Sequence, residues 1–374
     1  MCEFVLQAEH LEKLIQVIRG EGYQMLGPVL RDGAIVYDQI TTTQDLPRGW
    51  SDSQEKGFYR VEPGNTGAYF GYAVGPTSWK KFLQLPQRQV WRAQKTDDGL
   101  DFVQIVEEAP ALAFLGIRSC ELHAIGIQDR VFVDDQFCNE DYAHRRDRVL
   151  MIAVNCTSPA ATCFCTSMNT GPEVTANTDL ALTEVINDEE HYFLIASESY
   201  RGGQILQQLP LTPAAERHLK AAESAVQSAV YKMEQGPRSL DRAGVKDLLY
   251  RNYESPAWDL VAERCLSCAN CTMACPTCFC SDVQDTTDLS GEHAERWERW
   301  DSCFTGDFSY ITGGSVRPDT RSRYRQWMTH KLATWHDQFG SSGCVGCGRC
   351  ITWCPVGIDI TEEVQRIQAM ETAL

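Results

Sequence analysis

Hydrophobic residues recur at helical spacing in several parts of the chain. In residues 8–19, Leu11, Leu14, Ile15 and Ile18 fall on one face, which predicts an amphipathic helix. Further helices are predicted over residues 121–129, 202–209, 214–233, 241–253 and 257–264. The last of these helices is expected to lead directly into the C-terminal third of the chain.

Three short runs of almost continuous apolar residues indicate buried strands, because a strand that is covered on both faces has no polar side. They are residues 111–117, 149–154 and 192–196. Residues 25–40 predict two strands around the hairpin signal Arg31-Asp32-Gly33. Residues 41–75 are rich in glycine, proline and polar residues, which predicts surface loop and edge structure.

The strongest chemical signal lies in the C-terminal third, where one cysteine pattern occurs twice. Each copy reads C-x2-C-x2-C-x3-C-P, the run with which bacterial ferredoxins hold 4Fe–4S clusters. Three thiolates at this spacing wrap one corner of a cube if the chain turns tightly between them, and the fourth points toward the other cluster. The copies are Cys265, Cys268, Cys271 and Cys275, and Cys344, Cys347, Cys350 and Cys354.

Crossed ligation between the two copies predicts two 4Fe–4S clusters. The first is assigned Cys265, Cys268, Cys271 and Cys354, and the second is assigned Cys344, Cys347, Cys350 and Cys275. Zinc is the alternative metal, but zinc sites usually come as two separated C-x2-C pairs. The crossing ties both ends of residues 265–374 together, and it predicts that the insert at residues 281–340 is a small subdomain of its own.

Four more cysteines follow predicted strands or share one loop. Cys120 and Cys156 come directly after the apolar runs, where open α/β sheets place ligands, and Cys163 and Cys165 follow in the next loop. A buried cysteine can also serve simply as a small hydrophobic residue. The convergence favours a third 4Fe–4S cluster held by these four cysteines.

The insert contains three cysteines that the ferredoxin pattern does not explain. Cys278, Cys280 and Cys303 are candidates for tuning or replacing a ligand of the first cluster, for binding a further metal, or for packing beside a cluster. The spacing of Trp297 and Trp300 predicts a helix before Cys303.

A basic segment follows in the same insert. It comprises Arg317, Arg321, Arg323, Arg325, His330 and Lys331. One interpretation is a solvated face that pairs with local carboxylates. The other is a surface that docks an acidic partner or raises cluster potentials.

Composition limits the partners and the cellular compartment that are expected for this chain. The net charge of −17 makes nucleic acid and anionic membranes poor partners. The odd count of 17 cysteines, mostly in C-x2-C and C-x-C pairs, argues against a disulfide framework and for a reducing compartment. No signal peptide or membrane span is predicted, so the expected location is the cytoplasm. The chain also lacks a G-x-G-x-x-G turn after a strand, which places hydride chemistry on another subunit.

The motifs together resemble a known family, the iron–sulfur beta (electron-transfer) subunit of cytoplasmic NAD(P)-linked nickel–iron hydrogenases, also called sulfhydrogenases. The A subunit of anaerobic sulfite reductase is related to this family. The resemblance covers nearly the whole chain. Its signatures lie at residues 116–124, 155–157, 163–165, 275–278, 299–303 and 344–350.

The resemblance implies a division of labour between subunits. An FAD- and NAD(P)-binding iron–sulfur subunit would exchange hydride, and the small and large subunits of a nickel–iron hydrogenase would carry further clusters and the nickel–iron site. This chain would pass electrons between them and would not be catalytic alone. The alternative is the same role in an anaerobic sulfite reductase or in a sulfur or polysulfide reductase complex.

Together, these inferences predict an α+β fold and divide the chain into three parts. Residues 1–236 are predicted to form an α/β domain with the possible third cluster. Residues 237–264 form a helical linker, and residues 265–374 form a bacterial-ferredoxin-like dicluster domain with its insert.

Overall fold

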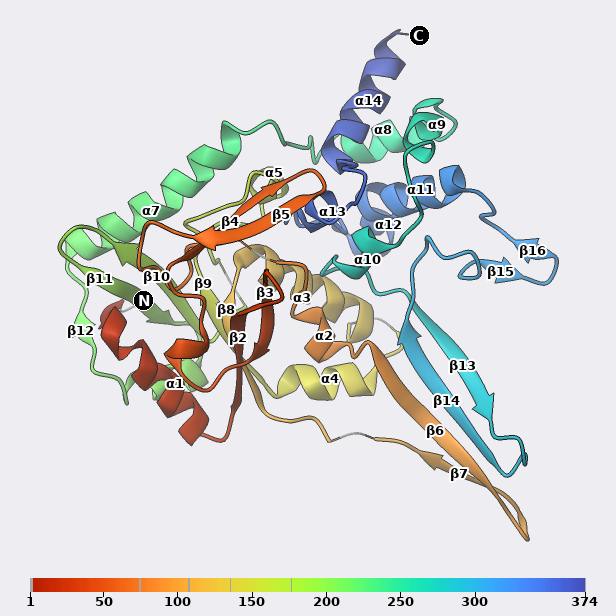
Figure 1. Ribbon diagram of the computed structural model, residues 1–374, viewed down its shortest axis with the longest axis horizontal. Helices are drawn as coiled ribbons and strands as arrows, with labels where there is room; N and C mark the ends of the chain where they lie inside the picture. Colours follow the sequence, from red (N-terminus) through yellow and green to blue (C-terminus); the bar gives the residue numbers. More distant parts are fainter. Residues whose placement is uncertain (1–2, 74, 107, 135, 176, 374) are drawn as a thin grey trace.

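An eight-stranded mixed sheet is the centre of the N-terminal half (Figure 1). The computed structural model describes residues 3–73, 75–106, 108–134, 136–175 and 177–373. The strand order is β12-β1-β11-β10-β9-β8-β2-β3, and the neighbours β2–β8, β8–β9 and β9–β10 are parallel. The strands are β1 (Phe4–Gln7), β2 (Gln24–Arg31), β3 (Ala34–Gln39), β8 (Leu112–Ile117), β9 (Val149–Val154), β10 (Leu180–Ile186), β11 (His191–Ser197) and β12 (Thr212–Pro213).

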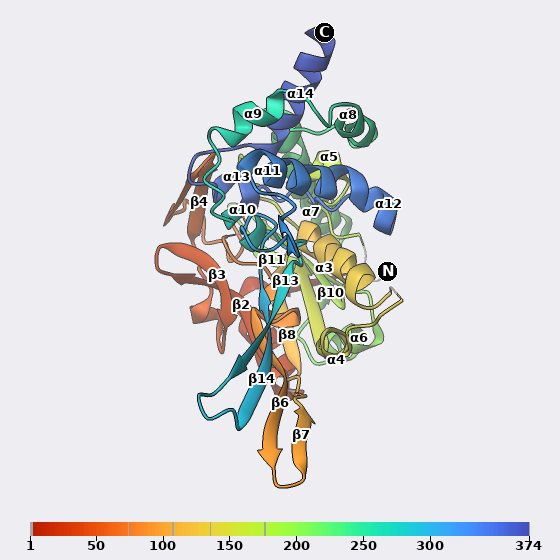
Figure 2. The same ribbon diagram turned by 90° about the vertical axis from the view of Figure 1, so that its right-hand side faces the viewer.

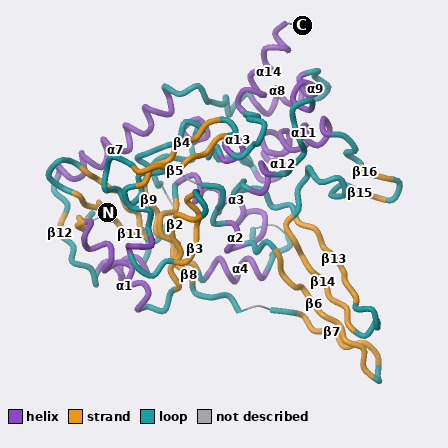
Figure 3. The backbone as a smooth tube through the Cα atoms, viewed as in Figure 1, coloured by secondary structure: helices purple, strands orange, loops and turns teal. Residues whose placement is uncertain are grey.

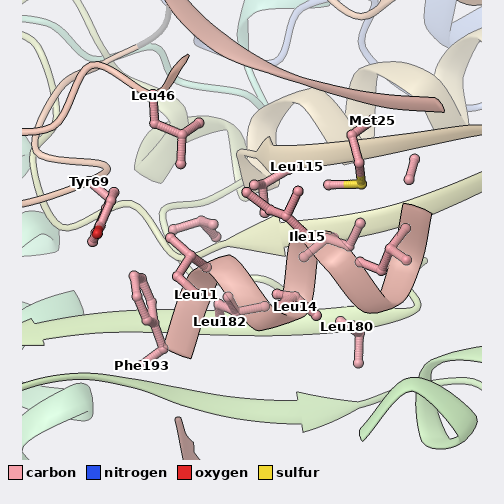
Figure 4. Close-up of a cluster of buried hydrophobic side chains, with 14 of the residues drawn as sticks. Leu11, Leu14, Ile15, Met25, Leu46, Tyr69, Leu115, Leu180, Leu182 and Phe193 are labelled. Atoms are coloured by element: carbon pink, nitrogen blue, oxygen red, sulfur yellow. The ribbon is translucent and has the colours of Figure 1, made fainter. Parts of the chain in front are cut away.

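Helices cover both faces of this sheet. Figure 4 shows Leu11, Leu14 and Ile15 of α1 (Leu11–Gly20) packed among Leu115 and Leu182 of the strands. Burying one such side chain stabilises the fold by roughly 1.5–3 kcal/mol. The apolar stripe of α1 therefore fixes this helix on the sheet.

The opposite face is covered by helices that follow the parallel strands. Leu122 of α3 (Ser119–Phe132) and Tyr142 of α4 (Glu140–Asp147) share a core with Phe114 of β8. Other helices of this half are α2 (Lys80–Leu83), α5 (Cys165–Met168), α6 (Tyr200–Leu206) and α7 (Glu216–Glu234). The two apolar runs that form β8 and β9 are buried at every position, which confirms the prediction of strands covered on both faces.

Residues 41–75 hold more regular structure than the sequence indicates. They include a short 3-10 helix (Thr43–Asp45) and the hairpin β4 (Trp50–Glu55) and β5 (Phe58–Pro63). At the hairpin turn, Gly57 donates a backbone hydrogen bond to the carbonyl of Ile351. The hairpin thus contacts the C-terminal cysteine region, a distant contact that local sequence patterns do not reveal.

A long four-stranded arm projects from the body of the molecule (Figures 1 and 2). It joins β6 (Gln87–Thr96) and β7 (Gly99–Gln104) of the first half to β13 (Ser281–Thr287) and β14 (His293–Trp300) of the insert. The insert therefore pairs with a strand that lies about 200 residues earlier in the chain. The domain boundaries themselves remain a prediction.

The predicted helix around Trp297 and Trp300 is wrong, because both residues lie in β14. Their helical spacing is real, but β14 hydrogen-bonds to β13 on one side and to β6 on the other. A strand with partners on both sides satisfies its backbone groups as fully as a helix does. The partner β6 could not be anticipated from the residues around Trp297.

Helices dominate the remaining C-terminal region (Figure 3). Trp258, Trp327 and Leu332 belong to its separate hydrophobic core. The elements are α8 (Val245–Arg251), α9 (Ala257–Ala262), α10 (Asn270–Met273), β15 (Tyr310–Ile311), β16 (Gly314–Ser315), α11 (Thr320–Thr329), a π-helix (His330–Thr334), α12 (Trp335–Phe339), α13 (Arg349–Thr352) and α14 (Ile360–Ala373). Among the described residues, no helix is long and apolar enough to cross a membrane.

The helices predicted from periodicity are confirmed at α1, α3, α6, α7, α8 and α9. Their ends shift by a few residues from the predicted bounds. The hairpin around Asp32 and Gly33 is also confirmed, and both of these residues have positive φ angles of 50° and 73°.

Candidate metal centres

The first cysteine site is a small cavity beside α10. Cys265, Cys268, Cys271 and Cys354 line it together with Cys350. These are the four cysteines predicted for the first cluster plus one cysteine of the second run. The other lining residues are mainly apolar and include Phe304, Tyr324, Trp327, Ile358 and Ile360. Such a lining excludes water, and its thiols are the donors that 4Fe–4S clusters use.

Tight turns place the cysteines of both runs, in agreement with their spacing. Ser267 and Ala269 of the first run have φ angles of 50° and 64°. Gly346 and Gly348 occupy the same places in the second run, with φ angles of 65° and 75°. Each run thus bends into the left-handed region between successive cysteines, which turns the thiols toward a common side.

The second group comprises Cys275, Cys344, Cys347 and Cys350. Burial raises the pKa of the Cys350 thiol well above its ordinary value, and the neighbouring thiols of Cys344, Cys347 and Cys275 raise it further. A thiol with a raised pKa stays protonated unless a metal ion stabilises the thiolate. The pKa of Cys275, in contrast, is lowered by a hydrogen bond with Cys278 and by the charge of Lys331. The thiols of Cys344, Cys347 and Cys275 thus lie close enough to Cys350 to act on it, in agreement with crossed ligation, while the ligand set itself stays a prediction.

A third cavity lies where β8 and β9 end. Cys120, Cys156, Cys163 and Cys165 line it, together with Cys347 and the side chain of Arg118. Cys120 is in the first turn of α3, and Cys165 opens α5. The four strand-end and loop cysteines thus converge on one cavity, and this donor set fits a third 4Fe–4S cluster.

The three groups share cysteines of the second run. Cys350 lines the first cavity, and Cys347 lines the third. Both cysteines belong to the second group, so this group lies between the other two. The second run also approaches residues 162–165 closely, since a Cβ atom added at Gly348 would collide with the Thr162 carbonyl oxygen.

The remaining cysteines, Cys278, Cys280 and Cys303, line neither of these cavities. A hydrogen bond from Cys303 lowers the pKa of Cys280 to about 7, despite the opposing effect of burial. Among the described residues, no group of three or more His, Cys, Asp or Glu is arranged to hold a single metal ion. The roles predicted for these three cysteines stay predictions.

Buried cations beside the cysteines are site residues that the sequence alone does not identify individually. Lys331 belongs to the basic segment, yet its side chain is 3% exposed and its Nζ lies 3.3 Å from Cys275 Sγ. Arg321 and Arg325 of the same segment pair with Glu254, in agreement with the interpretation of a solvated face. The sequence allows a charge near a cluster as one of two interpretations of this segment, and the contact with Cys275, 56 residues away, assigns it to Lys331.

Arg349 and Glu121 form a buried ion pair between the two halves. Arg349 Nη2 donates to Glu121 Oε1 at 2.6 Å, and each side chain is 1% exposed. Glu121 also accepts hydrogen bonds from the hydroxyl of Tyr37 and the indole of Trp79. This fully bonded carboxylate anchors the second cysteine run to the start of α3, next to Cys120.

Comparisons with known proteins agree with the cysteine geometry. Residues 264–358 match the family model of the 4Fe–4S dicluster domain. The chain is 29% identical over 295 residues to sulfhydrogenase 2 subunit beta of Pyrococcus furiosus, an alignment that covers 77% of this chain and 82% of that protein. No solved structure matches. The chain is thus a protein of mixed helices and sheets with a C-terminal 4Fe–4S dicluster domain, and it is similar to a sulfhydrogenase beta subunit.

Proposed function

We propose that this chain is the electron-transfer subunit of a sulfhydrogenase-like complex, with three 4Fe–4S clusters in series. The observation that carries the proposal is the sharing of second-run cysteines between the groups. Cys350 lines the first cavity and Cys347 lines the third, so one continuous run connects all three. When bound, the clusters supply one-electron redox chemistry.

Residues of this chain would bind the three clusters and shield them from water. The ligands proposed for the first cluster are Cys265, Cys268, Cys271 and Cys354, and those for the second are Cys344, Cys347, Cys350 and Cys275. Those for the third are Cys120, Cys156, Cys163 and Cys165. Apolar side chains around the first cavity exclude water, and the Arg349–Glu121 pair holds the second run against the third site.

The first site lies near the surface, which suits the entry or exit of electrons. Cys268 is exposed, and two apolar side chains that line the same cavity are also exposed: Leu266 by 64% and Val356 by 39%. Exposed apolar residues in one patch are typical of sites where proteins associate. We infer that a redox partner docks here.

The proposed partners are an FAD- and NAD(P)-binding iron–sulfur subunit on one side and the small and large subunits of a nickel–iron hydrogenase on the other, in the cytoplasm. The name of the relative supports the hydrogenase assignment. The same relay would also serve an anaerobic sulfite reductase or a sulfur or polysulfide reductase. Native co-purification under anaerobic conditions separates these options. A nickel–iron subunit supports the first, and a sirohaem subunit overturns it.

The number of clusters is tested by iron analysis of the anaerobically purified chain. Three cubanes require about 12 iron atoms per chain, whereas two require about 8. The variant Cys120→Ser is expected to lower the iron content toward 8 and to leave the C-terminal clusters visible by EPR. The exposed Cys138 serves as the matched control, because Cys138→Ser is expected to change nothing. About 8 irons in the unmodified chain would remove the third cluster.

A further inference from the structure

The charge around the three cysteine groups differs. Among the described residues that line the first cavity, none is a lysine, an arginine or a histidine. The buried carboxylate of Glu363, which lies near Tyr324, is paired with Arg264 and Arg366. Among the described residues that line this cavity or pair with Glu363, no cation is therefore both buried and uncompensated.

The second group, in contrast, contacts a buried lysine. Lys331 Nζ donates to Cys275 Sγ at 3.3 Å, to Thr277 Oγ1 at 2.9 Å and to the carbonyl of Gly343 at 3.2 Å. The carbonyl and the hydroxyl fix the ammonium against the thiol. Lys331 lies in the π-helix His330–Thr334, and single π-helical turns are frequent at functional sites.

The third site contains a buried arginine. Arg118 lines the cavity, is 4% exposed, and donates to the carbonyls of Phe70, Tyr72 and Asn155. These hydrogen-bond partners of the guanidinium are all neutral. The carboxylates of Glu121 and Asp52 also act on its charge, but Glu121 is already paired with Arg349, so part of the positive charge of Arg118 stays uncompensated. Arg349 lies between the second and third groups, but Glu121 balances its charge.

We propose that Lys331 and Arg118 order the reduction potentials along the relay, so that the first site has the lowest potential and the second and third sites have higher ones. This inference rests on the proposed electron-transfer function. Reduction adds one negative charge to a cluster, and a nearby positive charge or an N–H donor to a ligand sulfur stabilises the reduced form.

The consequence is a preferred direction. Electrons that enter at the first site pass to the second and then to the third. Each step oxidises one centre by one electron and reduces the next by one. The reductant is the two-electron reduced flavin of the proposed partner, which gives up its electrons one at a time. The exposed patch around Cys268 is then the entry side of the relay.

The experiment is a redox titration of the anaerobically purified full chain, followed by EPR. Lys331→Met removes the charge while keeping a long side chain. One centre is expected to become about tenfold harder to reduce, since a hydrogen bond to a charged group is lost. A tenfold change corresponds to about 59 mV for one electron. Lys331→Arg is expected to restore most of the shift, and Lys220→Met, at an exposed lysine on α7, is expected to shift nothing.

A second variant tests the inference without touching a buried residue. Val356 lines the first cavity and is 39% exposed, so Val356→Lys should fold and place a cation beside that site. The centre with the lowest potential is expected to rise, and it must differ from the centre that Lys331→Met shifts. The ordering is overturned if Val356→Lys raises a centre other than the lowest, or if Lys331→Met shifts no centre. A normal iron content with either result would leave the proposed relay intact.

Discussion

The two cysteine runs share one spacing but lie in opposite surroundings. In the first run, Leu266 is 64% exposed and Asn270 is at the surface. At the same places in the second run, Val345 is 2% exposed and Arg349 is 1% exposed. The comparison shows that the cysteines set which cluster is bound, whereas the residues between them set what the cluster packs against.

The turn residues show the same difference. Ala269 and Gly348 occupy equivalent positions, with φ angles of 64° and 75°. The turn alone does not require glycine, because alanine adopts it in the first run. Gly348 is required by the close approach of Thr162, whose carbonyl oxygen would collide with an added Cβ. Glycine at this position therefore marks contact with the third site.

The largest expected effect comes from removing iron. Chelation under anaerobic conditions should unfold much of the C-terminal helical region, because its small core is built around the clusters. The first run should lose amide protection completely, whereas the second should keep part of it through its contacts with the N-terminal half. Far-UV circular dichroism and hydrogen exchange measure these changes. An unchanged spectrum after complete iron loss would contradict the prediction.

The next effect tests the buried residue of the second run. Arg349→Asn gives this run the residue found in the first, and it leaves Glu121 buried without its cation. Removing one partner of a buried pair costs about 3–5 kcal/mol. The free energy of unfolding of the iron-loaded chain is expected to fall by that amount in denaturant titrations.

The reciprocal change, Asn270→Arg, is the matched control. Asn270 is exposed, and its side chain donates a hydrogen bond to the carbonyl of Trp353 at 3.3 Å, so the expected loss is about 1 kcal/mol or less. Equal losses from both variants would mean that the two runs have the same surroundings in solution, which is the opposite of what their exposed fractions indicate.

A smaller effect is expected from Gly348→Ala. The added Cβ collides with Thr162 and must also adopt a positive φ angle, which together cost roughly 1–3 kcal/mol. Gly291→Ala is the control, because Gly291 has a φ angle of 70° but no atom within 4 Å of an added Cβ. Both variants carry the backbone strain, and only Gly348→Ala adds the collision. The difference between the two variants in melting temperature and in iron content therefore measures the collision alone.

The sequence predicts the features that depend on local spacing. The apolar runs of β8 and β9 and the periodicity of α1 and α7 identify their elements, because burial imposes period and composition directly. The fourfold cysteine spacing likewise fixes the turns at residues 267–269 and 346–348. These features need no knowledge of distant partners.

Features that depend on distant partners cannot be predicted in this way. The local spacing at β14 predicts a helix, because its strand partner β6 is about 200 residues away. The local composition around Lys331 leaves a solvated face and a charge near a cluster both open, because the thiol that decides between them belongs to another segment. The central place of the second cysteine group could not be predicted either, since it arises from the packing of residues 162–165 against Gly346 and Gly348.

The smallest effect concerns the first run and uses Ala269→Gly. A non-glycine residue in the left-handed region costs roughly 1–2 kcal/mol, and glycine loses about 0.4–1 kcal/mol more through the unfolded chain. The net expectation is a gain of about 0.5 kcal/mol in the free energy of unfolding, measured by denaturant titration of the iron-loaded chain.

The neighbouring Ser267→Gly should not give this gain. Ser267 also has a positive φ angle, but its hydroxyl lies 3.1 Å from Thr320 Oγ1, and losing that hydrogen bond costs about 1 kcal/mol. A gain from Ala269→Gly without one from Ser267→Gly would show that the backbone strain at Ala269 exceeds what its methyl group contributes, whereas the hydrogen bond of Ser267 offsets the strain there. A loss from Ala269→Gly would mean instead that the Ala269 methyl group stabilises the first cavity, which it lines.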